Sequence, residues 1–476
     1  MTGAGGTGPP RAPERPWRGR RLHLVGVGGA GMSGYARAAH ALGAQLSGSD
    51  QASSPALERL RGEGVVDARV GHRGANLPEG DRVELIYSSA IPRDNAERVA
   101  ARARGIAERP RAALLAELSA LRRSIAVAGT HGKTTTAAML VHALRGAGAD
   151  PGWLVGSSVG GGLPNAHWSE GEWLVVEADE SDRSMLSLEV EVAVLTNVEL
   201  DHHASFASLE ELRAAFAQFL ASARGAIVLW DRPELLELLP TPALARVVAY
   251  DMPDPELRGG RARFTWRGRE VHLRLPGAHN ALNAVAALEA TRLAGLHDDG
   301  TARDPETDGA AGHQLDGAVG GLEAFTGAGR RFERVGRTRA GALVYDDYAH
   351  HPTEIVATLR AARTFEPARV VAVFQPHLFS RTALLAREFG RALAQADVVA
   401  VLEVYPARER AEDHPGVSGL TIARTTAEAA RGGRVYWLPR MEEASRVLGG
   451  ELERDDLCVT MGAGDIDRLA RGLVSQ

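Results

Sequence analysis

The stretch SIAVAGTHGKTTTAAML, residues 124–140, joins a short apolar strand to a helix through a turn that contains Gly129 and Gly132. Lys133 follows the second glycine and is the only lysine in the chain; the other 54 of its 55 Lys and Arg residues are arginine. A compact ammonium group fits a tight anion-binding loop in a way that a planar guanidinium does not. Glycines let backbone N–H groups approach an anion, and the start of a helix adds a favourable dipole. The stretch therefore predicts a phosphate-binding loop between a strand and a helix of an α/β sheet.

The spacing of this loop departs from the usual G-x-x-x-x-G-K-[ST] pattern, because Val127 stands where the pattern has glycine. An ordinary helix N-cap is the alternative interpretation. In the functional interpretation Lys133 reaches the β- and γ-phosphates of ATP, and the hydroxyl of Thr134 binds Mg²⁺. The residues predicted to contact ATP here are Gly129, Thr130, His131, Gly132, Lys133, Thr134 and Thr135.

Composition limits the class of protein. The chain has 476 residues, 44% of them hydrophobic and 24% charged, with a formal net charge of −5. This length predicts about three domains. No acidic or basic tail and no apolar run of membrane-spanning length is present, so neither nucleic acid nor a membrane is expected as a partner. The composition is that of a globular protein with several hydrophobic cores.

The N-terminal residues 1–20, MTGAGGTGPPRAPERPWRGR, lack the apolar middle region of a secretion signal. We expect a disordered leader there, in a cytoplasmic protein. The single cysteine, Cys458, excludes an intramolecular disulfide and is expected to be a buried residue of the strand DLCVTMG.

Two further strand-then-turn openings resemble the phosphate loop in layout. They are RLHLVGVGGAGMSG at residues 21–34 and RVVAVFQPH at residues 369–377. Alternation of strands and helices predicts an α/β fold with parallel sheets. We expect a Rossmann-like domain over 21–123, a central ATP-binding domain with a parallel sheet over 124–329, and a second Rossmann-like domain over 330–476. Residues 298–320 are polar and rich in glycine, which predicts a flexible surface insertion.

Acidic residues follow two apolar strands downstream of the phosphate loop. EWLVVEADESD places Glu177, Asp179, Glu180 and Asp182 after a strand, and VAVLTNVELDHH places Asp201, His202 and His203 in a similar position. Ligands of open α/β sheets lie beyond the carboxyl ends of the strands. Carboxylates beside a phosphate loop suit Mg²⁺, whereas a histidine also allows Mn²⁺. A solvated acidic turn is the alternative.

The N-terminal turn carries Gly26, Gly28 and Gly31 in a G-x-G-x-x-G pattern, and Asp50 follows 19 residues after Gly31. This pattern predicts binding of a nucleotide diphosphate. It fits NAD and a UDP-sugar equally well, so the ligand stays open on these residues alone.

The order of these segments resembles the Mur ligase family over roughly residues 21–470. The segments that carry the resemblance include GVGGAGMSG, SSAI, GTHGKTTT, EADESDRS, TNVELDHH, PGAHNALNA, GRRFERVG, YDDYAHHPTEI, FQPHLFSRT and MGAGDI. The resemblance implies three domains: a UDP-binding unit, an ATPase and a C-terminal domain that takes the amino acid. Several branches of the family have a carbamylated lysine at the metal site. This chain has no second lysine, which agrees with the alanine-adding branch.

The resemblance also assigns roles to individual residues. It places Lys133, His202 and Arg331 in catalysis, with Arg331 reaching the γ-phosphate. It implies one Mg²⁺ at Thr134 and Glu177 and a second metal at His202. The remaining contacts that it implies are Asn280 and Asn283 for adenine, Asp347 for ribose, Tyr348, His377 and Arg381 for the amino acid, and Gly28, Gly29, Ala30, Gly31, Met32, Ser33, Asp50, Ser88 and Ser89 for the UDP-sugar.

The reaction implied by the resemblance is ATP-dependent joining of L-alanine to the lactoyl carboxylate of UDP-N-acetylmuramate, a step in peptidoglycan precursor synthesis, by a monomer or homodimer. Three alternatives stay open. A related ligase adds a recycled tripeptide to the same UDP-sugar, the N-terminal turn alone could belong to an NAD-dependent dehydrogenase, and the loop alone could belong to a nucleotide-dependent switch.

Overall fold

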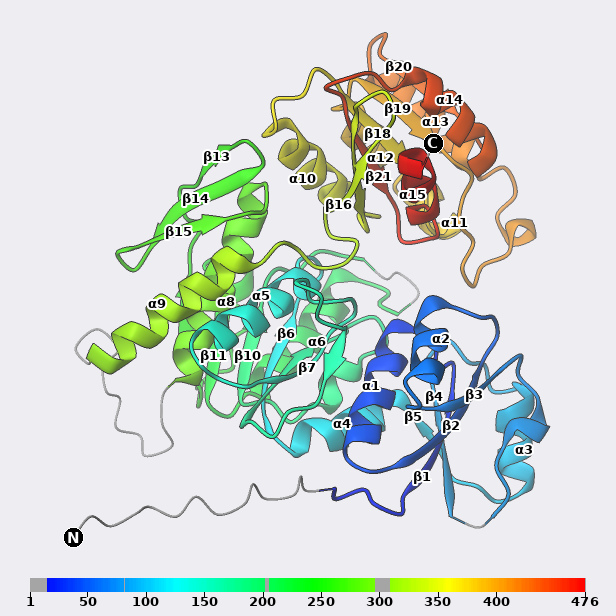
Figure 1. Cartoon of the computed structure of the whole chain (residues 1–476), viewed down its shortest axis with the longest axis vertical. Helices are drawn as coiled ribbons and strands as arrows, with labels where there is room; N and C mark the ends of the chain where they lie inside the picture. Colours follow the sequence, from blue (N-terminus) through cyan, green and yellow to red (C-terminus); the bar gives the residue numbers. More distant parts are fainter. Residues whose placement is uncertain (1–14, 81, 202–204, 296–308, 476) are drawn as a thin grey trace.

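The computed structural model describes residues 15–80, 82–201, 205–295 and 309–475, the side chains of 309–311 excepted. It has three α/β domains that follow one another along the chain (Figure 1). The predicted fold class of three domains built on parallel sheets is confirmed. None of the helices in the described ranges is long and apolar enough to cross a membrane.

The N-terminal domain has a five-stranded parallel sheet in the order β3-β2-β1-β4-β5. Its strands are β1 (Arg21–Val25), β2 (Gln45–Asp50), β3 (Asp67–Val70), β4 (Val83–Tyr87) and β5 (Glu108–Pro110). Its helices are α1 (Ala30–Ala41), α2 (Pro55–Gly62), α3 (Ala96–Ala103) and α4 (Arg111–Ala120), with a 3-10 turn η1 (Gly74–Asn76). Because the strands are parallel, the glycine turn after β1 lies at the same sheet edge as the ends of β2 and β4.

The central domain has a seven-stranded sheet in the order β12-β11-β10-β6-β9-β7-β8, in which only the short edge strand β8 is antiparallel. The strands are β6 (Arg123–Ala128), β7 (Gly152–Leu154), β8 (Ala166–His167), β9 (Trp173–Glu177), β10 (Val192–Leu195), β11 (Ala226–Trp230) and β12 (Arg246–Tyr250). Its helical elements are α5 (Lys133–Gly146), η2 (Ser184–Ser187), α6 (Leu209–Ala221), α7 (Pro233–Leu236), α8 (Ala278–Ala294) and α9 (Gly309–Ala324). The phosphate loop follows β6, so it emerges between the ends of β9 and β10, the two strands that carry the acidic segments.

A small antiparallel sheet of β13 (Glu256–Arg258), β14 (Arg261–Trp266) and β15 (Arg269–Leu273) adjoins the central domain. It is an addition that we did not predict from the sequence. The sequence of β14, RARFTW, alternates between polar and apolar residues, and in the structure every second side chain of this strand is buried while the others are exposed. In Figure 1 this sheet lies beside helix α10 (Pro352–Arg363) of the next domain.

The C-terminal domain has a six-stranded sheet in the order β16-β17-β21-β18-β19-β20, parallel except for β16. Its strands are β16 (Glu333–Arg337), β17 (Leu343–Asp347), β18 (Val370–Phe374), β19 (Val398–Val401), β20 (Arg434–Trp437) and β21 (Leu457–Met461). Its helical elements are α10 (Pro352–Arg363), α11 (Phe379–Leu384), α12 (Ala386–Leu393), η3 (Ala411–Asp413), α13 (Gly419–Ala429), α14 (Met441–Glu451) and α15 (Asp467–Ser475). Cys458 is fully buried in β21, as predicted.

The hydrophobic cores join the first two domains more closely than the third. One continuous apolar cluster runs from Trp17 in the N-terminal domain to Ala245 in the central domain. The two main clusters of the C-terminal domain contain no residue that precedes Phe332. The junction between the C-terminal domain and the phosphate loop is therefore mainly polar, as the contacts below show.

Two sequence-based predictions differ from the structure. Part of the expected flexible insertion, residues 309–320, belongs to helix α9, which packs against α5. Glycines allow this contact: a Cβ at Gly317 would lie 2.3 Å from the Gly146 carbonyl oxygen, and one at Gly321 would lie 2.2 Å from that of His142. Residues 298–308 of that prediction lie outside the described residues.

The prediction of a disordered leader is wrong for residues 15–20. The indole of Trp17 is buried, its backbone N–H donates to the Leu42 carbonyl at 3.0 Å, and the Arg20 guanidinium lies 4.6 Å from the indole ring centre. These contacts attach residues 15–20 to the N-terminal domain. Residues 1–14 lie outside the described part of the chain.

Candidate active site

The phosphate loop takes its shape from two glycines with positive φ. Gly129 has φ +133° and Gly132 has φ +82°, conformations that L-residues with a side chain rarely adopt. Side chains are also excluded by space. A Cβ added at Gly129 would lie 2.1 Å from the Thr196 hydroxyl oxygen, and a Cβ added at Gly132 would lie 2.7 Å from Asn283 Oδ1. Helix α5 starts at Lys133 without a capping side chain and without an acidic residue in its first turn. Its N-terminal N–H groups are therefore suited to bind an anion.

The ammonium group of Lys133 lies over this loop. Its Nζ donates to the carbonyl oxygens of Gly129 at 2.6 Å and Thr130 at 3.0 Å, and to Glu180 Oε1 at 2.9 Å. Burial lowers the pKa of this ammonium group, but the negative charges of Glu180 and Asp179 outweigh it and raise the pKa above its ordinary value. Lys133 is thus a fixed, fully charged cation at the mouth of the loop.

The Glu177 carboxylate, the Thr134 hydroxyl and the Arg331 guanidinium meet beside Lys133. The Thr134 hydroxyl donates to Glu177 Oε1 at 2.7 Å, and Glu177 Oε2 accepts the Gly156 N–H at 2.6 Å. The Arg331 guanidinium, which comes from the start of the C-terminal domain, reaches Thr134 Oγ1 at 3.3 Å. An oxygen pair of this kind suits a hard divalent cation such as Mg²⁺. His202, predicted as a second metal ligand, and His203 lie outside the described residues.

The rest of the acidic segment after β9 is held by Arg111, which we did not single out from the sequence. Its guanidinium donates to Asp179 Oδ2 at 2.8 Å and to Asp182 Oδ2 at 2.5 Å. Burial alone would raise the pKa of Asp179, but Arg111 and Lys133 hold that pKa at about 2. A Cβ at Gly31 would lie 2.7 Å from Arg111 Nη1. Arg111 therefore connects the N-terminal glycine turn to the acidic segment beside the phosphate loop.

The segment after β10 supports the phosphate loop through residues that the sequence analysis did not assign. Asn197 accepts the His131 backbone N–H at 2.9 Å and donates to the His131 carbonyl at the same distance. The Thr130 hydroxyl donates to the Glu199 carbonyl at 2.9 Å. In the sequence, the polar residues that follow β10 are the feature that indicates this supporting role. The His131 ring points to Glu199 and Glu354.

The N-terminal glycine turn is arranged around Asp50. Asp50 Oδ2 accepts the Gly28 N–H at 2.8 Å, and a Cβ at Gly28 would lie 2.9 Å from that oxygen. Helix α1 starts after Gly29 with no capping side chain and no acidic residue in its first turn. The other residues predicted here follow in α1 or lie at the end of β4: Ala30, Gly31 and the buried Met32 and Ser33, then the half-buried Ser88 and the exposed Ser89. Their position at one sheet edge fits a diphosphate ligand.

The residues predicted for adenine and ribose already have partners. Asn280 is buried and donates to the Pro276 carbonyl at 2.7 Å, and the Asn283 side chain packs on Gly132 in the phosphate loop. The two oxygens of Asp347 accept the N–H groups of Phe332 at 2.8 Å and Ala349 at 2.7 Å. Burial raises the pKa of Asp347 to about 7. A ribose hydroxyl would have to share Asp347 with the turn that places Arg331.

The residues predicted for the amino acid form one group with Asp201. Arg381 and Asp201 are both buried, and Arg381 Nη2 donates to Asp201 Oδ1 at 2.6 Å. The His377 Nδ1 lies 3.4 Å from Arg381 Nη1. Burial and the nearby His350 and Arg381 lower the pKa of His377 to about 3, so its ring is neutral. Tyr348 is half-buried, and its ring lies 5.1 Å from the Arg331 guanidinium carbon.

These contacts bring the central and C-terminal domains together around one site. Arg331 contacts Thr134, Arg381 contacts Asp201, and the Thr353 hydroxyl donates to Glu199 Oε1 at 2.7 Å. The arrangement places a phosphate loop, paired oxygen ligands and cations from a second domain at the same point. Chemically, it can stabilise a phosphoryl group in transfer while a second substrate is held by the C-terminal domain.

Comparison with known proteins agrees with this geometry. Three family models match consecutive parts of the chain: "Mur ligase family, catalytic domain" over residues 21–123, "Mur ligase middle domain" over 127–291, and "Mur ligase, glutamate ligase domain" over 330–464. Relatives from Rubrobacter xylanophilus and Mycolicibacterium smegmatis, both named UDP-N-acetylmuramate–L-alanine ligase, are each 41% identical. The alignments cover 96% of this chain and 100% and 95% of the relatives.

A solved structure of UDP-N-acetylmuramate–alanine ligase from Thermotoga maritima has a TM-score of 0.78 at 27% identity, covering 96% of this chain and 98% of that one. A murein peptide ligase from Psychrobacter arcticus shares the fold, with a TM-score of 0.68 at 23% identity and coverage of 96% and 98%. From the three matched domains and the full-length relatives, the chain belongs to the Mur ligase family.

Proposed function

We propose that this protein is an ATP-dependent ligase that joins L-alanine to the lactoyl carboxylate of UDP-N-acetylmuramate, forming ADP and phosphate in peptidoglycan precursor synthesis. The names of the full-length relatives support this substrate pair. The observation that carries the proposal is the meeting of Lys133, the Thr134–Glu177 pair and Arg331 from another domain. We further propose that it acts in the cytoplasm, where ATP is available.

For the nucleotide, we propose that the loop of Gly129, Thr130, His131, Gly132, Lys133, Thr134 and Thr135 binds the phosphates of ATP. Lys133 would exchange its contact with Glu180 for the β- and γ-phosphates, and Arg331 would move the short distance from Thr134 to the γ-phosphate. Asn280 and Asn283 would lie near adenine and Asp347 near ribose, sharing their present partners.

For the metal, Thr134 and Glu177 would hold Mg²⁺ or Mn²⁺, and His202 would bind a second ion. Their oxygens, 2.7 Å apart, fit a hard cation. When bound, the metal supplies positive charge that offsets the charge of the phosphates.

For the other substrates, we propose that the turn from Gly28 to Ser33, with Asp50, Ser88 and Ser89, binds UDP-N-acetylmuramate. Tyr348, His377 and Arg381 would bind L-alanine. Arg381 would attract the alanine carboxylate. The His377 ring, which is neutral, would lie near the alanine amine and could accept a hydrogen bond from it.

The mechanism proposed for these residues has two steps. An oxygen of the lactoyl carboxylate attacks the γ-phosphorus, the bond to ADP breaks, and Lys133 and Arg331 stabilise the transferred phosphoryl charge. The alanine amine then attacks the acyl carbon, phosphate leaves, and the amine loses a proton as the amide forms. Closure of the C-terminal domain would orient the substrates and exclude water.

The test is phosphate release in the presence of all three substrates. Lys133→Ala should abolish it, whereas Arg145→Ala, at the exposed opposite end of α5, should retain it. Omission of either UDP-N-acetylmuramate or L-alanine should suppress it strongly. Release that is indifferent to both would refute the ligase assignment, and preference for a tripeptide over L-alanine would show that the acceptor is wrong.

A further inference from the structure

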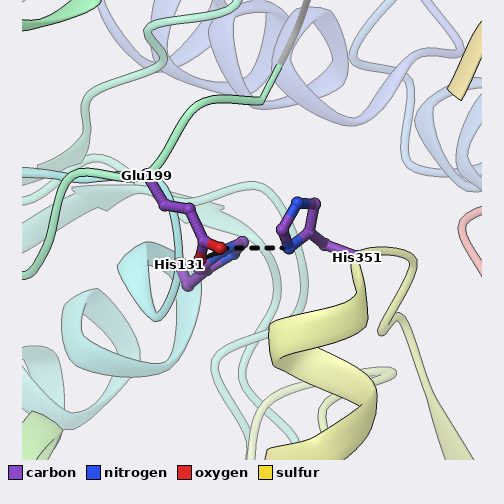
Figure 2. A group of neighbouring side chains, drawn as sticks. All are labelled: His131, Glu199 and His351. Atoms are coloured by element: carbon purple, nitrogen blue, oxygen red, sulfur yellow. Dashed lines mark hydrogen bonds and ion pairs between the residues drawn. The ribbon is translucent and has the colours of Figure 1, made fainter. Parts of the chain in front are cut away.

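Three side chains from two domains point toward one another beside the phosphate loop (Figure 2). His131 belongs to the phosphate loop, Glu199 follows β10, and His351 is the N-cap of α10 in the C-terminal domain. One ligand atom from each residue lies within 4.8 Å of the other two. Two imidazoles and one carboxylate form a donor set that suits Zn²⁺ and similar transition metals better than Mg²⁺.

Glu354 orients the His131 ring from behind. His131 Nδ1 lies 3.3 Å from Glu354 Oε1, and Nε2 lies 2.9 Å from Glu199 Oε2. Glu354 is itself fixed, because its Oε2 accepts the His350 N–H at 2.9 Å and the His351 N–H at 3.2 Å. Both ring nitrogens of His131 face carboxylates, and Glu199 and Glu354 raise the pKa of His131 to about 9, so a metal ion bound at Nε2 would replace the ring proton that now faces Glu199. A carboxylate behind a histidine in this way is the usual support of a metal-binding imidazole.

His351 offers the second nitrogen. Its Nδ1 lies 3.9 Å from Glu199 Oε1, and the hydrogen bond that it accepts from the Thr353 N–H is long, at 3.4 Å. Burial and the neighbouring His131 lower the pKa of His351 below its ordinary value, which keeps the ring neutral and its lone pair available. The Thr353 hydroxyl, which donates to Glu199 Oε1 at 2.7 Å, holds the carboxylate between the two rings.

The spacing and exposure of the three residues fit an ion of this class. Ligands about 2.0–2.1 Å from a tetrahedral Zn²⁺ lie roughly 3.3 Å apart. Here His131 Nε2 lies 2.9 Å from Glu199 Oε2 and His351 Nδ1 lies 3.9 Å from Glu199 Oε1, and one donor atom from each residue lies within 4.8 Å of the others, so small side-chain rotations would bring the three donors around an ion. The His131 and His351 side chains are 14% and 6% exposed, whereas that of Glu199 is 41% exposed and gives access from solvent. Solvent can also supply a fourth ligand.

We propose that His131, Glu199 and His351 form a binding site for a transition-metal ion of the Zn²⁺ class, with Glu354 as the supporting carboxylate. The site is separate from the Thr134–Glu177 oxygen pair and does not depend on the proposed function. Its ligands come from both the central and the C-terminal domain, so a bound ion links the phosphate loop to helix α10.

The test is a titration of the full-length, untagged, nucleotide-free protein with Co²⁺, which reports its coordination by visible absorption. We expect one equivalent of four- or five-coordinate Co²⁺, displaced by equimolar Zn²⁺ and not by millimolar Mg²⁺. Glu199→Gln and His351→Asn should remove this signal, and asparagine retains an acceptor at the N-cap. Glu354→Gln should weaken binding by about 10–100-fold.

His272→Asn is the matched control, because His272 is more than half exposed and lies on the small antiparallel sheet. It should leave the Co²⁺ spectrum unchanged. Melting curves without metal check that each variant is folded. Zn²⁺ should raise the melting temperature of the parent protein and of His272→Asn fully, that of Glu354→Gln by less, and those of Glu199→Gln and His351→Asn not at all. The proposal is overturned if Glu199→Gln, which alters a partly exposed side chain, binds Co²⁺ as the parent does, or if Mg²⁺ displaces the ion.

Discussion

Gly132→Ala should disable the phosphate loop by a mechanism that a matched glycine variant can isolate. Gly132 has φ +82°, and Gly148, beyond the other end of α5, has φ +89°. Alanine at either position costs about 1–2 kcal/mol for a left-handed conformation. A Cβ at Gly148 meets nothing within 4 Å, whereas one at Gly132 would lie 2.7 Å from Asn283 Oδ1. Only Gly132→Ala therefore has to move the loop or the asparagine, by about 0.7 Å to restore ordinary contact.

A displacement of that size at a site that positions reacting atoms costs on the order of 10²-fold in rate. We expect both variants to lose similar stability in urea unfolding, and only Gly132→Ala to lose about 10²-fold in kcat/KM for ATP in the phosphate-release assay. Because Asn283→Ala removes the obstructing oxygen, Gly132→Ala should cost less kcat/KM in the Asn283→Ala background than in the parent protein, a comparison that cancels any loss of the proposed adenine contact. Equal kcat/KM values for Gly132→Ala and Gly148→Ala would refute this reasoning.

Three further predictions concern charge and metal. Glu97 is fully buried, and hydrogen bonds from His23, Ser49 and Asn76 outweigh the effect of burial and hold its pKa at about 2. Glu97→Gln should therefore lower the free energy of unfolding by up to about 3 kcal/mol near neutral pH, and this difference should disappear as the pH falls from about 4.5 toward 2. Urea unfolding over this pH range measures it, with the exposed Glu79→Gln as control. Arg331→Lys should lower kcat by about 10²-fold or more while the exposed Arg339→Lys does not; an unchanged kcat would remove Arg331 from the mechanism. EDTA should abolish phosphate release, Mg²⁺ or Mn²⁺ should restore it, and Glu177→Gln should raise the Mg²⁺ concentration required; a normal Mg²⁺ requirement in that variant would exclude Glu177 as a ligand.

The sequence predicted the parts of this protein that depend on local pattern. The strand, glycine turn and helix at 124–140 and the polar ends of β9 and β10 all lie where the parallel α/β fold requires. The prediction for residues 309–320 was wrong because glycine and aspartate weigh against a helix in isolation. In the folded chain the same glycines let the backbones of α9 and α5 touch, and tertiary packing outweighs propensity.

Pairings between distant charged side chains could not be predicted in this way. Arg111 is one of many arginines, and nothing in its local sequence indicates that it joins Asp179 to the N-terminal glycine turn. The same holds for the Arg381–Asp201 pair, whose members are 180 residues apart. Such contacts depend on how domains meet, which no local period encodes.

The different uses of lysine and arginine follow from the two kinds of contact at the site. Lys133 Nζ has three acceptors around a single point, two of them carbonyls of its own loop, and a compact ammonium satisfies all three without widening the loop. Arg331 and Arg381 instead cross a polar domain junction, where a long side chain with several N–H donors keeps one contact while it exchanges another. A compact cation anchored to its own loop carbonyls therefore belongs to the loop, and longer cations belong to the domain that closes over it, which explains why a chain otherwise built with arginine retains one lysine.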